Sequence, residues 1–140
     1  MELLVILVVV LLILPFIYYL AALQRAFGRC APQSRMMKPS YVWLMLIPGF
    51  WFIWHFVIVI HLAKSLRNEF TRLSIHCPDP APARNLGLAT SILAVLGIAP
   101  LLPLVAFIPG LVCWILYWGK VSEYAKMLPD PNHLTSAVSG

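Results

Sequence analysis

Residues 41–63 decide the fold and read YVWLMLIPGFWFIWHFVIVIHLA. The stretch contains no Asp, Glu, Lys or Arg, yet it carries two histidines, His55 and His61. At about 1.5 Å of rise per residue, a helix of this length measures roughly 34 Å, against a bilayer hydrocarbon core of about 30 Å. The stretch is therefore predicted to be a membrane-spanning helix.

The composition of the whole chain indicates the same environment. Of the 140 residues, 61% are hydrophobic and only 11% are charged, so polar side chains are too few to cover the apolar ones. This excludes an ordinary soluble domain. The formal net charge is +5, and the basic residues lie in the connections between apolar runs, a pattern that suits phospholipid head groups better than nucleic acid.

The apolar runs predict an all-α, polytopic integral membrane protein with a single domain over residues 1–128. Residues 86–118 are uncharged and would form a helix of about 50 Å, too long for one span, so the chain is expected to turn at Pro100 and Pro103. Three spans with a proline-broken third remain the alternative. The predicted segments are 2–23, 41–63 continuing as an amphipathic interfacial helix to about 73, 85–99 and 104–127, followed by a polar tail, 129–140.

Positive charge predicts the orientation. The connection after the first segment carries four basic residues and no acid, whereas Glu2 precedes that segment, so this connection is expected in the cytoplasm and the amino terminus on the outer side of the membrane. The connection after the second segment also carries four basic residues, although the two connections flank one predicted span. We let the first connection decide, which places Cys30 and Cys77 on opposite faces. The residues predicted to meet lipid head groups are Arg25, Arg29, Arg35, Lys38, Lys64, Arg67 and Arg72.

His55 is the main candidate for chemistry, because a titratable group inside a span is costly unless it faces protein, water or a cofactor. It could be a neutral, hydrogen-bonded structural residue, which we favour, a haem or chlorin ligand, or a proton-relay group. Trp51 and Trp54 lie beside it and could line a ligand site, although ordinary packing is the simpler interpretation. His61 lies about 120° around the helix, and no metal site is predicted.

Two further features concern helix contacts. Small residues that allow close helix packing recur in the third segment at Gly87, Ser91, Ala94 and Gly97. Pro48 and Gly49 interrupt the second segment, as broken helices do in transporters, but no acidic residue lies beside the break. Catalytic motifs and paired carboxylates are missing from the sequence, so an enzyme is not predicted.

The sequence also resembles a known family. The run Trp43-Leu-Met-Leu-Ile-Pro48-Gly-Phe-Trp51-Phe-Ile-Trp54-His-Phe, with the later Leu62-Ala-Lys-Ser-Leu66 and Trp114-Ile-Leu-Tyr-Trp118-Gly-Lys120, is similar to a family of small uncharacterised bacterial multi-pass membrane proteins. Members share a Trp-rich Ile-Pro motif in the second span. Where that family is expected to place an asparagine after the proline, this chain has Gly49, Phe50 and Trp51. The resemblance implies a helical membrane fold and a bacterial inner membrane, without an activity.

These observations favour a non-catalytic integral membrane subunit or scaffold that packs against other membrane subunits of a larger complex, such as an energy-transducing one. A small transporter or channel that uses His55 beside the Pro48-Gly49 break is the first alternative. A tetrapyrrole-binding membrane protein with His55 as ligand is the second. No cofactor is the simplest expectation, with haem or chlorin open under the second alternative.

Overall fold

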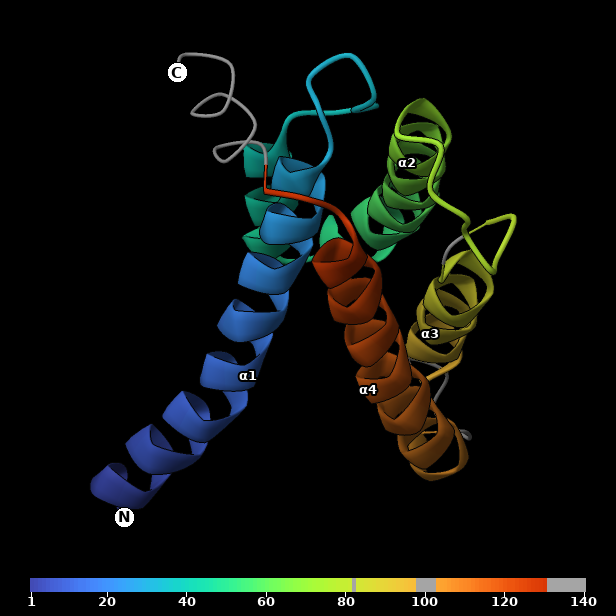
Figure 1. Ribbon diagram of the computed structural model, residues 1–140. Coiled ribbons are helices and arrows are strands. Elements are labelled where there is room, and N and C mark those ends of the chain that lie inside the picture. The colour runs from blue at the N-terminus through green and yellow to red at the C-terminus, as the bar shows by residue number, and fades with distance from the viewer. Residues whose placement is uncertain (82, 98–102, 131–140) are drawn as a thin grey trace.

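A computed structural model describes residues 1–81, 83–97 and 103–130, and these residues form helices and connections without a strand. In chain order the elements are α1 (Glu2–Arg29), the 3-10 helix η1 (Pro39–Leu46), α2 (Trp51–Arg72), α3 (Arg84–Leu96) and α4 (Pro103–Met127). The α4 helix packs between α1 and α3, and α2 contacts both α1 and α3. Figure 1 shows α1 and α4 close together near their carboxyl ends and far apart toward their amino ends.

The predicted single helix over 41–63 is wrong. Its first part is the 3-10 helix η1, and α2 begins only at Trp51. Pro48 has no amide donor and favours an extended residue before it, and Ile47 is indeed extended at φ −74° and ψ 115°. Gly49 follows at φ +81°, a conformation that costs a residue with a side chain more than it costs glycine. The Pro48-Gly49 pair therefore ends one element before the next can start.

The chain reverses at this break, so η1 and α2 enter and leave the bundle at the same end. The Trp43 indole donates a hydrogen bond to Gln24 Oε1 at 2.7 Å, which holds η1 beside α1. Farther along, the Met36 amide donates to Ser65 Oγ at 2.9 Å, and Asn68 Nδ2 donates to the Ser34 carbonyl at 3.4 Å. The connection before η1 thus lies against the carboxyl half of α2.

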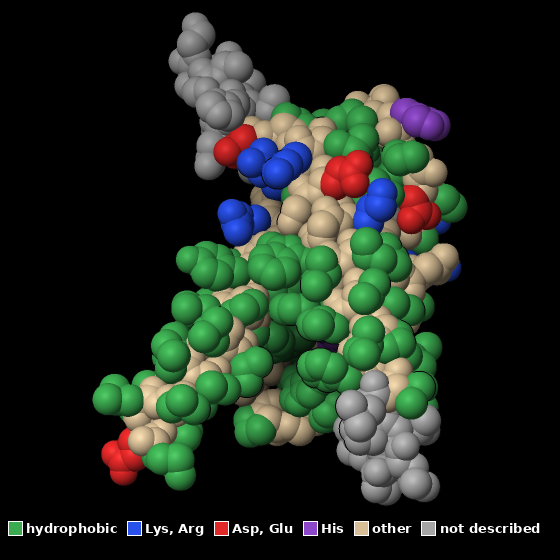
Figure 2. All heavy atoms as spheres, turned by 90° about the horizontal axis from the view of Figure 1, so that it is seen from below, with side chains coloured by type: hydrophobic (Ala, Val, Ile, Leu, Met, Phe, Trp, Pro, Cys, Tyr) green, Lys and Arg blue, Asp and Glu red, His purple; other side chains and the backbone are tan. Residues whose placement is uncertain are grey.

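This reversal brings most of the charged side chains to one end of the molecule. The basic end of the molecule, which we define as residues 25–38, 64–72 and 120–130, holds nine of the ten Lys and Arg residues. Arg84, the tenth, begins α3, and Glu2 lies at the opposite end of α1. Figure 2 shows Lys, Arg, Asp and Glu side chains gathered at one end of the visible face, apolar side chains over the rest, and one acidic side chain at the far tip.

The same reversal affects Cys30 and Cys77, which were expected on opposite faces of the membrane. Cys30 caps the carboxyl end of α1 at the basic end. Cys77 packs against the same core cluster, close to Tyr124, whose ring lies 6.1 Å from that of Phe70. The chain segments that carry these two cysteines therefore pack against one core cluster.

The other helices follow the predicted segments with shifted ends. The α1 helix runs six residues beyond the predicted end at residue 23, and it continues through Pro15, as α4 continues through Pro109. The predicted turn at Pro100 falls among residues 98–102, which lie outside the described residues. Most of the predicted tail, at 131–140, lies outside them as well. Among the described helices, only Glu2–Arg29 and Val105–Met127 are long and apolar enough to cross a membrane. The α3 helix has 13 residues, and the second half of α2 is charged.

The core lies toward the basic end. Its largest fully buried side chains include Tyr19 and Phe27 of α1, Phe70 of α2 and Tyr117 of α4. The apolar face of the α2 continuation, which we expected at a lipid surface, instead packs into this core through Leu62, Leu66 and Phe70. Residues 3–14 of α1, in contrast, are exposed throughout.

Candidate functional site

A buried polar cluster takes one residue from each of α1, α2, α3 and α4. We call Tyr19, His55, Ser91 and Tyr117 the polar node. The Tyr19 hydroxyl lies 2.8 Å from His55 Nε2, and Ser91 Oγ lies 2.5 Å from His55 Nδ1. The Tyr117 ring lies 6.2 Å from both the Tyr19 and the His55 rings. All four residues are at least 95% buried, so the node fixes the helices relative to one another.

The hydrogen bonds define which imidazole nitrogen carries the proton. Ser91 Oγ donates its single proton to the Gly87 carbonyl at 2.9 Å, so it must accept a hydrogen bond from His55 Nδ1. His55 Nε2 then carries no proton and accepts from the Tyr19 hydroxyl. One directed chain runs from Tyr19 through His55 and Ser91 to the Gly87 carbonyl, and it satisfies a neutral imidazole completely.

Tyr117 is the exception within the node. Its hydroxyl is buried, and it has no hydrogen-bond partner among the described residues. An unpaired buried hydroxyl costs free energy, because it loses water without gaining another partner. Within the described structure, Tyr117 is therefore held in the node by the packing of its ring and not by a hydrogen bond of its hydroxyl.

Gly87 allows α3 to approach the node. A Cβ atom at this position would lie 2.6 Å from Val59 Cγ1 and 2.8 Å from Tyr117 Cε2, closer than real Cβ contacts. The glycine thus lets α3 contact α2 and α4 at once. Ser91 follows one turn later on the same face and reaches His55.

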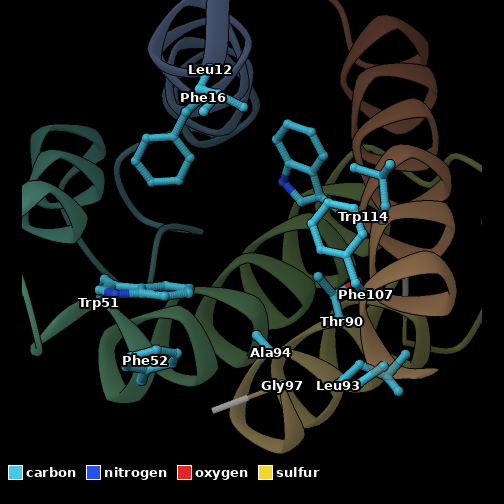
Figure 3. Close-up of a pocket in the computed structure, with 13 residues that line it drawn as sticks. Leu12, Phe16, Trp51, Phe52, Thr90, Leu93, Ala94, Gly97, Phe107 and Trp114 are labelled. Atoms are coloured by element: carbon cyan, nitrogen blue, oxygen red, sulfur yellow. The ribbon is translucent and has the colours of Figure 1, made fainter. Parts of the chain in front are cut away.

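An apolar cavity of about 730 Å³ opens beside the node, toward the end away from the charges. In Figure 3, Phe16 of α1, Trp51 of α2 and Trp114 of α4 surround the opening, with Ala94 and Gly97 of α3 along one wall. Leu12 and Phe107 extend the α1 and α4 walls. The cavity exists because α1 and α4 diverge, and four of its lining residues are glycine or alanine: Ala94, Gly97, Ala106 and Gly110.

The predicted candidate residues are thus divided between two roles. His55, Gly87 and Ser91 belong to the node, whereas Trp51, Ala94 and Gly97 line the cavity. Trp54 does neither, because its indole donates a hydrogen bond to the Tyr41 carbonyl at 2.8 Å and joins α2 to η1 across the reversal.

The predicted head-group residues lie at the basic end, with different degrees of freedom. Arg35 folds back on the carboxyl end of α1, where Nε donates to the Phe27 and Cys30 carbonyls at 2.9 and 2.8 Å. A cation at a helix carboxyl end is favourable because it meets unpaired carbonyls and the negative end of the helix dipole. Arg29 donates to the Leu128 carbonyl at 3.2 Å. The exposed members are Arg25, Lys38, Lys64, Arg67 and Arg72.

Glu69 is a site residue that the sequence analysis missed. Its buried carboxylate accepts two hydrogen bonds from Arg72, at 2.6 and 3.0 Å, and further ones from the Ser34 hydroxyl and the Ala31 amide. Burial raises the pKa of Glu69, but these bonds and the Arg72 charge more than offset it, so the pKa lies below its usual value. The Glu69–Arg72 spacing was visible in the sequence, but the contact with the first connection was not.

The arrangement limits the chemistry that His55 can perform. Both imidazole nitrogens are already hydrogen-bonded, so ligation of a metal or haem through Nε2 would first break the bond to Tyr19. Within the described part of the chain, no three His, Cys, Asp or Glu side chains come together in a group that could hold a metal ion. His55 is thus held by two hydrogen bonds in a buried cluster that lies beside an open apolar cavity.

Comparison with known proteins adds no relative: no protein-family model matches the chain, and no match was found among curated proteins or solved structures.

Proposed function

We propose that this chain is a polytopic integral membrane protein whose basic end faces the cytoplasm and whose amino terminus faces outward. The proposal is supported by α1, where the 22 uncharged residues 3–24 measure about 33 Å, close to a bilayer hydrocarbon core. Arg25 follows directly at the basic end, and clustered Lys and Arg favour the cytoplasmic side. The resemblance to small bacterial membrane proteins makes the bacterial inner membrane the proposed location.

In this arrangement α1 crosses the membrane once, and η1 with α2 forms a re-entrant hairpin. The α3 helix descends from the cytoplasmic side, and α4 returns to it. Non-helical backbone at membrane depth is tolerated where protein buries it, and the Trp54 and Trp43 hydrogen bonds tie η1 to α2 and α1. Both basic connections then satisfy the positive-inside rule together.

Within the membrane the chain acts as a non-catalytic subunit that receives a transmembrane helix of a larger partner in the apolar cavity. The observation that carries this function is the divergence of α1 from α4, which leaves residues 3–14 of α1 exposed and opens the cavity beside them. The four small lining residues support a helix as the occupant, because glycine and alanine let helix backbones approach closely where lipid gives no hydrophobic driving force.

The two alternatives receive less support from the geometry. A transport pathway through His55 would need polar access, but His55 is 5% exposed and the adjoining cavity is apolar. A tetrapyrrole ligated by His55 would have to displace Tyr19 from Nε2. An absorption spectrum of the purified protein with a Soret band would favour the tetrapyrrole instead.

Site-specific photo-crosslinking in native membranes tests the subunit function. A photoreactive phenylalanine analogue is placed at Leu12 or Phe107, on facing walls of the cavity, and at half-exposed Val112 of α4, which does not line it. We expect one adduct of the same discrete mass from Leu12 and Phe107, and only lipid adducts from Val112. Native mass measurement after gentle extraction should give a complex that contains the same partner.

Two glycine variants supply the matched control. Gly110 lines the cavity, whereas a side chain at Gly119 on the same helix would meet open space. Gly110→Leu should abolish the adduct, and Gly119→Leu should leave it unchanged. Lipid adducts alone at all three positions, or a gently extracted protein found only as a monomer or homo-oligomer, would contradict the proposal.

A further inference from the structure

A second cavity, of about 300 Å³, lies between the carboxyl halves of α1 and α4. The residues that line it are Ala22, Arg25, Arg29, Ser122, Ala125 and Lys126. The two alanines leave space between the helices, and the lining carries three cations, one hydroxyl and no carboxylate. We call this the basic pocket, and its composition suits an anion with several oxygen acceptors.

The cations of the basic pocket differ in how they are held. Arg29 is positioned by its Nη1 hydrogen bond to the Leu128 carbonyl, which leaves its other donors for a ligand. Within the described part of the chain, Arg25 donates only from Nε, to the Ala21 carbonyl at 3.3 Å, and Lys126 makes no hydrogen bond. Lys120, one turn before the pocket, is by contrast paired with Glu123 at 3.4 Å. The pocket therefore gathers cations whose charge is available.

The position of the pocket identifies the kind of anion. It lies at the basic end, where the proposed membrane placement puts the cytoplasmic head groups. Its lining comes from the carboxyl halves of α1 and α4, which Figure 1 shows close together next to the region where the two helices diverge. Exposed Tyr18 of α1 and half-buried Trp118 of α4 follow below it, at the depth where amphipathic rings meet acyl chains. A head group in the pocket would thus place its hydrocarbon chains beside these two rings, in the bilayer.

We propose that the basic pocket binds the phosphate of an anionic phospholipid from the cytoplasmic leaflet. Basic pockets between transmembrane helices on this side are suited to anionic head groups, because phosphate oxygens accept from Arg and Lys while the chains remain in the bilayer. The proposal rests on the membrane placement described above, but not on the partner helix. The bound lipid would also join α1 to α4 at the point where they separate.

Native mass spectrometry of the full chain tests this proposal. Detergent-solubilised protein is titrated with phosphatidylglycerol or phosphatidylcholine at physiological salt, and bound lipids per chain are counted. We expect one phosphatidylglycerol to bind at least tenfold more tightly than phosphatidylcholine. The double variant Arg25→Gln/Lys126→Gln should lower the affinity for phosphatidylglycerol roughly tenfold or more, because two cations near the phosphate are lost.

The control removes the same charge elsewhere at the basic end. Lys64→Gln/Arg67→Gln alters two exposed cations outside the pocket, and it should change phosphatidylglycerol affinity less than twofold. Both double variants keep Arg29, and circular dichroism with thermal unfolding verifies that they fold. Equal losses of phosphatidylglycerol affinity in the two double variants would indicate a general attraction between the lipid and the positive charge of this end. That result would overturn the proposal of a specific site.

Inorganic phosphate distinguishes a lipid from a free anion. If millimolar phosphate displaces phosphatidylglycerol or raises the melting temperature as much as the lipid does, the lipid assignment fails. These readouts are independent of the partner-helix function, since lipid binding to the basic pocket does not involve Gly110. Loss of the photo-adduct with lipid binding intact would therefore refute the subunit function alone.

Discussion

The Tyr19 hydroxyl donates a hydrogen bond to His55 Nε2, while Tyr117, whose ring lies 6.2 Å from each of theirs, leaves its own hydroxyl unpaired among the described residues. Of the two tyrosine hydroxyls in this cluster, one is thus hydrogen-bonded and the other has no partner among the described residues. Because removal of one partner leaves the other buried and unsatisfied, the same substitution should have different effects at the two positions.

Tyr19→Phe should lower the free energy of unfolding by about 1 kcal/mol, because the imidazole nitrogen loses its donor. Tyr117→Phe should leave it unchanged or raise it by up to about 0.5 kcal/mol, because a desolvated hydroxyl is removed without loss of a hydrogen bond. Reversible unfolding in mixed micelles compares the two variants directly. A larger loss from Tyr117→Phe than from Tyr19→Phe would show that the polar node is arranged differently.

Gly87→Ala should destabilise the protein by about 1–3 kcal/mol, since the added methyl group would collide with Val59 and Tyr117 in a packed region. Gly119→Ala is the matched change, because its Cβ meets nothing within 4 Å, and it should be neutral or stabilising by up to about 1 kcal/mol through helix propensity. Equal effects in the same unfolding assay would mean that α3 does not approach α2 and α4 closely.

The sequence was sufficient to predict an all-helical chain and the approximate limits of α3 and α4. Long apolar runs and proline positions are local signals, and they report helices directly. The Pro48-Gly49 break was also visible, but its consequence was not, because a break inside an apolar run does not show whether the chain continues forward or turns back. The return of α2 beside the first connection depends on long-range contacts such as that between Met36 and Ser65.

The candidate sites were predictable in a similar, partial way. A histidine in an apolar run predicted a residue that needs a partner, and small residues in the third segment predicted close contact. Its partners, Tyr19 and Ser91, each lie 36 residues away along the chain, in opposite directions. Contacts at that separation produce no pattern in a single sequence. The two cavities depend on the angle between α1 and α4, which composition and periodicity do not encode.

Glu69→Gln should lower the free energy of unfolding by about 1–3 kcal/mol at neutral pH, because Ser34 and the Ala31 amide lose a charged acceptor in a buried site. Arg72→Gln should cost less, since the Arg72 side chain is 36% exposed and water can replace part of the interaction. A smaller effect at Glu69 than at Arg72 would argue against the carboxylate as the link between α2 and the first connection.

The contribution of Glu69 should also depend on pH with a defined sign. Because the pKa of Glu69 in the folded protein lies below its unfolded value, its stabilisation is complete above the unfolded carboxyl pKa of about 4.3. It is then lost as the pH falls through the folded pKa. The difference in unfolding free energy between wild type and Glu69→Gln should therefore be constant from pH 7 to about 5.5 and shrink at lower pH. A difference that grows on acidification would contradict a depressed pKa.

The re-entrant arrangement of η1 and α2 predicts which residues share a side of the membrane. Burial raises the pKa of the Cys30 thiol to about 12, so the native cysteine is a poor probe. In a cysteine-free background, Ser40→Cys and Arg67→Cys are exposed and lie before and after the reversal. Both should react with a membrane-impermeant maleimide only from the cytoplasmic side, whereas Glu2→Cys should react only from outside. A helix that crossed the membrane between residues 40 and 67 would separate the first two labels, so their labelling from opposite sides would refute the reversal at Pro48-Gly49.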